Sequence, residues 1–168
     1  MTPAQYAQVG ADVSAAIVAR LALAAPLALV LDRDPVNLDE VQWLAALKST
    51  ADEDENGDTR THAWIVTFAA TDEPQSNKIK SIEPIFRFNF ELFYTHDFGT
   101  TIDNSEQRIR AEVLRTQFMI AQTPHLGIGA VSTHRQLRMR LRLARLGGEV
   151  IHRGTGTLEA EIQSQYVG

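Results

Sequence analysis

The sequence of 168 residues contains no cysteine. Disulfide bridges, a thiolate nucleophile and a cysteine-bound zinc site are therefore excluded. An excess of positive charge is missing too, because 16 basic residues stand against 21 acidic ones and the formal net charge is −5. We therefore expect no general coat of nucleic acid. Any contact with a polyanion would need a local basic patch.

A long uninterrupted apolar run is also missing. The most apolar stretch, residues 17–31, is interrupted by Arg20 and Pro26. It is too short and too broken to span a bilayer. Asp12 precedes it, so it lacks the basic start of a signal peptide. We therefore expect no membrane partner.

Motifs with catalytic or metal-binding spacing are absent as well. No serine lies in a GxSxG context, and the glycines at 127–129 and 154–156 are too few for a phosphate loop. Neither HxxxH nor HExxH occurs among the five histidines: His62, His96, His125, His134 and His152. His96-Asp97 is the most suggestive pair, but neighbours at a strand end point apart. We predict no catalytic residue, no cofactor and no metal, hence a protein that is not an enzyme.

The densest apolar feature is the stretch of residues 84–95. Arg87, Asn89 and Glu91 alternate there with apolar side chains, and this period of two predicts a half-buried strand. Burial of the whole apolar row would contribute on the order of 10 kcal/mol before entropy is counted. We therefore expect the core to form around this row: Phe86, Phe88, Phe90, Leu92 and Tyr94.

Periodicity and capping patterns predict the other elements. Apolar residues at spacings of three and four predict two long helices, at 3–25 and 103–122. The inner face of the second helix should carry Ile109, Val113, Leu114, Phe118 and Ile120. Residues 37–47 fit a short helix better than a strand. We expect strands at 27–31, 62–70 and 157–167, turns at 32–35 and 154–156, and a flexible connection at 125–131.

Residues 137–143 alternate leucine or methionine with arginine. The propensities of leucine and arginine favour a helix, whereas the strict period of two favours a strand, which we prefer. Arg138, Arg140 and Arg142 would then share one face. That face is either a solvated row or an interface with acidic side chains or phosphate, which guanidinium groups bind in a bidentate manner.

Residues 52–58 carry five acidic side chains. The spacing of Asp52, Asp54, Asn56 and Asp58 matches the start of an EF-hand calcium loop, but Ala63 stands where the loop needs a bidentate glutamate. We therefore interpret the segment as a solvated acidic turn. Asp52, Asp54 and Asp58 are candidates for contact with the arginine row of a neighbouring copy.

Together these elements predict one α+β domain over residues 1–168. Helices segregated from strands along the chain are typical of that class. We expect an antiparallel sheet with the two long helices packed on its aromatic face.

The order of elements resembles the tail-terminator, or tail-completion, proteins of long-tailed bacteriophages. In that family an N-terminal helix precedes a β-hairpin, the second hairpin strand runs into a long helix, and a strand closes the chain. Residues 38–58 and 137–153 differ from the plain family pattern. The segments that match it are 3–25, 62–70, 84–95, 103–122 and 157–167.

The resemblance implies a structural virion protein, assembled in the host cytoplasm and located in the tail and neck. It would form a homo-oligomeric ring, a hexamer, that caps the head-proximal end of the tail tube. Its partners would be its own copies, the tail tube protein and a neck or head-completion protein, with DNA passing through the lumen without sequence specificity. The alternatives are another neck component (a head-closure, or stopper, or connector protein), a small ligand-binding or enzymatic α+β domain, and a calcium-binding module.

Overall fold

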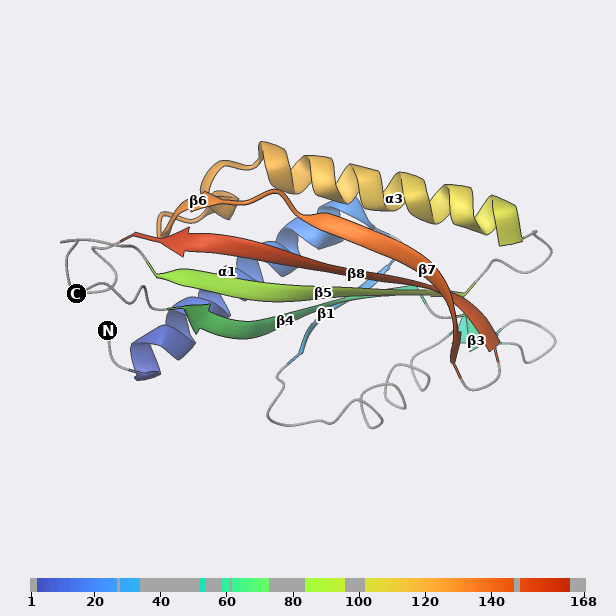
Figure 1. Ribbon diagram of the computed structural model, residues 1–168, viewed down its shortest axis with the longest axis horizontal. Coiled ribbons are helices and arrows are strands. Elements are labelled where there is room, and N and C mark those ends of the chain that lie inside the picture. Colours follow the sequence, from blue (N-terminus) through green and yellow to red (C-terminus); the bar gives the residue numbers. More distant parts are fainter. Residues whose placement is uncertain are drawn as a thin grey trace.

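The computed structural model describes residues 3–26, 28–33, 52–53, 59–60, 62–72, 84–95, 102–146 and 149–163. Within them a twisted sheet forms one layer and two long helices form the other (Figure 1). The elements in chain order are α1 (Pro3–Ala24), β1 (Leu29–Arg33), β2 (Asp52–Glu53), β3 (Thr59–Arg60), β4 (His62–Asp72), β5 (Ile85–Thr95), α3 (Ile102–Gln122), the 3₁₀-helix η1 (Pro124–Gly127), β6 (Val131–His134), β7 (Arg138–Leu146) and β8 (Glu149–Ile162).

The main sheet has six strands, in the order β1-β4-β5-β8, and β6 and β7 then lie end to end along the far edge of β8. β8 reaches both because it is 14 residues long. It pairs with β7 near its start and with β6 near its end. β1 runs parallel to β4, and the other described pairs are antiparallel. The predicted α+β class and the two helices on one sheet face are confirmed.

The centre of the core is the apolar row of β5. Phe86, Phe88 and Leu92 have no exposed surface, and Phe90 and Tyr94 are nearly as buried. The row packs beneath both helices, in one cluster with Val13, Ile17 and Leu21 of α1 and with Ile109, Val113 and Ile120 of α3. The prediction that this row receives the two helices is confirmed.

α1 is long and apolar enough to cross a bilayer if length and composition alone are considered, with a mean hydropathy of 1.4 in Ala4–Ala24. In this fold its apolar stripe lies on the sheet, and Val13, Ile17 and Leu21 are fully buried there. A helix in a two-layer domain packs on its sheet through one apolar stripe of this kind.

The turn predicted at 154–156 is wrong, because these residues lie inside β8. The register places Gly156 between Phe90 of β5 and Met139 of β7. A Cβ atom on Gly156 would lie 2.5 Å from the sulfur of Met139 and 2.8 Å from the carbonyl oxygen of Arg138. The glycine therefore makes room for large neighbours and does not turn the chain. The predicted final strand is accordingly only the second half of β8.

Two connections also differ from the prediction. Residues 32–33 extend β1 where a turn was expected. The connection expected to be flexible at 125–131 is built from η1 and the first residue of β6. Its Leu126 is buried, although its backbone has a positive φ of 51°. Burial of that leucine in the main core holds the connection in place.

The predicted inner face of α3 is wrong at Leu114 and Phe118, which are 64% and 63% exposed. Phe118 follows Ile109 by nine residues, or about two and a half helical turns. It therefore lies on the opposite side of the helix from the buried Ile109. The helix carries apolar residues on two sides, and the sequence analysis assigned both sets to a single inner face. The predicted helix at 37–47 and the end of the predicted last strand lie outside the described residues.

Replacing Gly156 should test this packing. We expect Gly156→Val to lower the free energy of unfolding by about 1–3 kcal/mol, because the added side chain overpacks the space beside Met139. Urea unfolding followed by circular dichroism measures the change. The control Thr157→Val lies one residue away on the exposed face and should change stability by less than about 0.5 kcal/mol. Equal stability of the two variants would contradict the packing described here.

Candidate functional site

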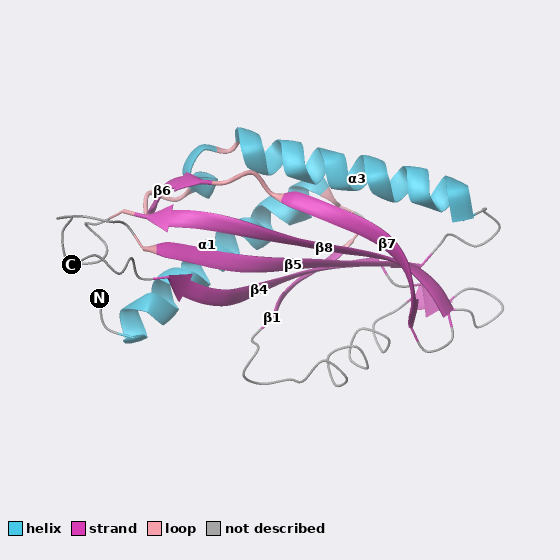
Figure 2. Cartoon of the chain, viewed as in Figure 1, coloured by secondary structure: helices cyan, strands magenta, loops and turns pink. Residues whose placement is uncertain are grey.

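The two long helices cover one face of the main sheet, and no helix in the described part of the chain lies on the opposite face, which we call the open face (Figure 2). At one end of this open face a small apolar cluster forms from Ala63, Ile65, Phe93 and Ile151. The rest is a polar groove of about 850 Å³, which we call the arginine groove. Its polar lining comprises Thr67, Asn89, Glu91, Arg135, Gln136, Arg138, Arg140, Arg153, Thr155, Thr157 and Glu159.

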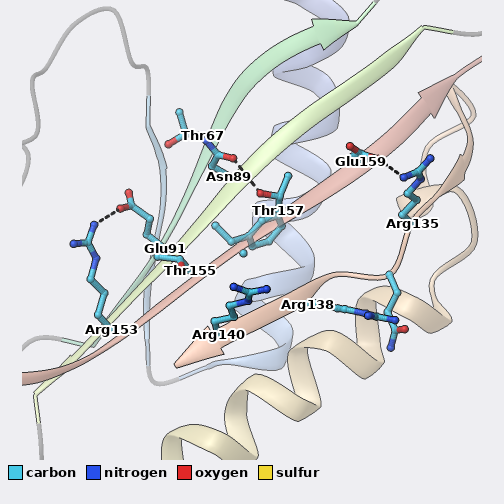
Figure 3. Close-up of a pocket in the computed structure, with 13 residues that line it drawn as sticks. Thr67, Asn89, Glu91, Arg135, Arg138, Arg140, Arg153, Thr155, Thr157 and Glu159 are labelled. Atoms are coloured by element: carbon cyan, nitrogen blue, oxygen red, sulfur yellow. Dashed lines mark hydrogen bonds and ion pairs between the residues drawn. The ribbon is translucent and has the colours of Figure 1, made fainter. Parts of the chain in front are cut away.

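Ion pairs occupy both glutamates on the floor of the groove (Figure 3). The Glu91 carboxylate lies 3.0 Å from Nη2 of Arg153. Glu159 serves two arginines: one oxygen accepts from Nε of Arg87 at 3.0 Å and the other lies 3.1 Å from Nη1 of Arg135. The floor is therefore fixed by pairs between neighbouring strands, and its negative charge is matched within the sheet.

The wall of the groove is β7, which carries Arg138, Arg140 and Arg142 on the open face. The three side chains are exposed. The register places Arg138 opposite Thr157 and Arg140 opposite Thr155. In the described part of the chain, no ion pair joins these three arginines to an acidic side chain. Two guanidinium groups, each beside a hydroxyl, thus remain available to an anionic group.

The open face carries a local excess of positive charge. Among the side chains described there, six arginines stand against three glutamates. The sequence as a whole has a net charge of −5, so its residues outside this set carry the negative excess. The charged side chains of this face are Arg87, Arg135, Arg138, Arg140, Arg142 and Arg153, with Glu91, Glu159 and Glu161.

The predicted arginine strand is confirmed, and the helical alternative is wrong. The strand forms because Leu137 is fully buried and Met139 and Leu141 pack against the main core, which leaves the arginines on the other face. Asp52 lies in β2, opposite Arg60 of β3. Asp54 and Asp58 lie outside the described residues. Contact between the arginines and the acidic segment of a neighbour therefore stays a prediction.

A buried carboxylate that the sequence analysis missed fastens α3 to β4. Glu112 Oε1 accepts a hydrogen bond from Nε1 of Trp64 at 2.6 Å, and Nε2 of His62 lies 2.9 Å from the same oxygen. His62 also meets the ring of Tyr94 edge-on, with 4.9 Å between centroids. The sequence did indicate that this carboxylate is buried, because Glu112 follows Ile109 by three residues on the face predicted to be buried. Its contacts join two elements of the core, so we interpret it as an anchor of the helix.

Two other histidines contact backbone carbonyl groups around η1. Nδ1 of His125 lies 2.7 Å from the oxygen of Val131, and Nε2 of His134 lies 3.1 Å from the oxygen of Thr123. These contacts hold the connection between α3 and β6. Within the described ranges no three histidine, aspartate or glutamate side chains are placed to hold a metal ion. His96 and its neighbour lie outside those ranges.

No protein-family model matches the chain, and no curated protein matches its sequence.

Removing the Glu112 carboxylate should destabilise the fold. We expect Glu112→Ala to lower the free energy of unfolding by about 1–3 kcal/mol, because the buried indole N–H of Trp64 loses its acceptor. Urea unfolding followed by tryptophan fluorescence measures the loss. The control is Glu106→Ala on the same helix, which removes only a surface pair with Arg110 and should cost less than about 0.5 kcal/mol. A loss at Glu112 no larger than the control's would exclude the anchoring role.

Proposed function

We propose that this chain is a structural virion protein of the tail-terminator type. In this proposal its copies form a ring that caps the head-proximal end of a phage tail tube and joins the tube to the neck. The observation that carries the proposal is the separation of charge between the arginine groove and the rest of an acidic chain.

Such a separation favours contact between unlike surfaces of two copies. The cationic groove of one copy attracts an acidic surface of the next, and after that contact the pair still offers one free groove and one free acidic surface. Head-to-tail association of this type continues until the rotation between subunits closes a ring. A ring is the assembly that a tail terminator needs, because it blocks further growth of the tube without closing its lumen.

The order of elements supports the same proposal. α1 precedes the hairpin of β4 and β5, α3 follows β5 after a connection of six residues, and β8 is the last described strand. This is the order that resembles the tail-terminator family. The pairing adds that β8 lies beside β5 in the middle of the sheet. The closing strand is therefore part of the core that the helices cover.

The outer side of α3 supports a further contact. Leu114 and Phe118 lie one helical turn apart and both are mostly exposed, as is Leu143 of β7. Large apolar side chains exposed together on one helix face are typical of surfaces that bind another protein. In the proposed ring they give the tail tube or the neck a surface separate from the arginine groove.

A small ligand-binding domain is the second candidate. The groove is large enough for a small molecule, and its guanidinium and hydroxyl groups are suited to an anion. Saturable binding of a small phosphorylated or carboxylated compound to the full chain, without any assembly, would favour this candidate.

The ring itself can be tested on the purified full-length protein. We expect native mass spectrometry to detect one closed oligomer and negative-stain electron microscopy to image single rings. Raising the salt concentration from about 50 mM to about 500 mM should shift the oligomer toward monomer, because screening weakens contacts between exposed charges. Added tail tubes should be capped at one end. Long tubes would indicate a tube subunit, and a monomer that does not bind tube ends would contradict the proposal.

A further inference from the structure

The outer edge of β7 is open. β7 pairs with β8 along one edge, and no strand in the described part of the chain pairs with its other edge. We propose that this open edge, with Arg138 and Arg140, binds the acidic segment 52–58 of a second copy. The inference rests on the proposed function, because it names the contact between neighbouring subunits of the ring.

The positive charge of Arg138 and Arg140 on β7 favours an anionic partner from outside the sheet. The floor glutamates of the groove, Glu91 and Glu159, are already paired with arginines. Arg138 and Arg140 are exposed on the wall, and each has a threonine hydroxyl opposite it on β8. A guanidinium group binds a carboxylate with two parallel hydrogen bonds, and the neighbouring hydroxyl can add a third.

The spacing of the charges agrees on the two sides. Arg138 and Arg140 stand two residues apart on one strand face, which separates them by about 7 Å. Asp52 and Asp54 are also two residues apart in the sequence, so their carboxylates would lie at the same interval if the segment bound in extended form. Asp52 itself lies in the strand β2.

The open edge favours a polypeptide over a nucleic acid. The N–H of Met139 points away from β8 and donates to Oε1 of Gln117 at 2.7 Å. Gln117 of α3 therefore occupies the edge between Arg138 and Arg140. Because neighbouring residues alternate, the backbone groups of Leu141 and Leu143 point the same way, and a second backbone would pair with them beyond Gln117. Moreover, the described lining of the groove exposes no aromatic ring on which bases could stack.

We assign the segment to a second copy because β2 does not pair with β7 of its own chain. β2 and β3 form a separate two-stranded sheet that does not join the main one. Five of the seven residues in 52–58 are acidic, which makes this the densest negative segment of the sequence. Every copy therefore brings both halves of the contact, as a ring of identical subunits requires.

Charge reversal tests the contact in the full chain. We expect Arg140→Glu and Asp54→Arg each to raise the concentration of half-assembly about tenfold at low salt, because each places like charges together. The double variant should return to within about threefold of the native protein. Arg110→Glu, with the same change of charge on the exposed side of α3, should leave assembly unchanged. Circular dichroism and melting temperature verify that each variant is folded.

A second experiment, the binding of a peptide, does not depend on ring formation. A fluorescent peptide of residues 51–59 should bind the dilute full-length protein about tenfold more tightly than the same peptide with asparagine and glutamine in place of its acids. Arg140→Glu and Arg140→Gln should both remove that preference. Inorganic phosphate and a single-stranded oligonucleotide are the competitors. Binding of either one in the absence of peptide binding would overturn the inference in favour of a small anion or a nucleic acid.

The two arms separate the possible failures. Rings that are insensitive to reversal of Arg140 and Asp54 would overturn this inference and leave the proposed function standing. Specific peptide binding by a protein that never forms rings or caps tubes would support the contact and contradict the proposed function. Loss of assembly in both single reversals without recovery in the double variant would also overturn the pairing.

Discussion

The alternation of β5 between apolar and polar side chains divides the sheet into a closed and an open face. The two helices pack over Phe86, Phe88 and Phe90 and remove these apolar side chains from water. The same period of two places Asn89 and Glu91 on the other face, where they form the floor of the arginine groove. A slip of one residue in the pairing would exchange the faces, so the core that stabilises the fold also fixes the position of the site.

The neighbours of β5 follow the same division. On the closed side, β8 places Gly156 where Phe90 and Met139 need space, and Glu112 fixes α3 by accepting from Trp64. On the open side, the strands carry hydroxyl and charged groups. Ion pairs between neighbouring strands neutralise the glutamates on the floor of the groove. An arginine row beside such a surface is easily tolerated, because two exposed charges about 7 Å apart repel by only about 0.6 kcal/mol in water. The row also protects the open edge of β7 from pairing with arbitrary strands, while a partner with acidic residues is attracted.

Much of the fold could be predicted from the sequence because its signals are local and periodic. α1, α3, β4, β5 and β7 each show their period within their own residues. The errors arose where the deciding contact lies elsewhere in the chain. The local sequence around Gly156 predicts a turn. Only the side chains of the two neighbouring strands explain why a glycine lies inside β8. The parallel pairing of β1 with β4 likewise has no local signal.

The site was predictable only in part. The shared face of Arg138, Arg140 and Arg142 follows from their spacing. The groove itself depends on the register of β4, β5, β7 and β8, which brings Thr155 and Glu159 beside arginines far away in the sequence. The exposed position of Phe118 was hidden for a related reason, because an apolar residue on the surface of a helix looks the same in sequence as one in the core.

Cross-linking between introduced cysteines measures whether the open face of one copy meets the acidic segment of the next. The native chain has no cysteine, so a thiol-specific cross-linker acts only at introduced sites. Thr155→Cys lies in the groove and Asn56→Cys in the acidic segment, and neither substitution changes the charge. With a short bismaleimide, we expect covalent dimers when the two variants are mixed and none when either is treated alone. Rings that assemble from the mixture without cross-linking between these positions would contradict this contact between copies.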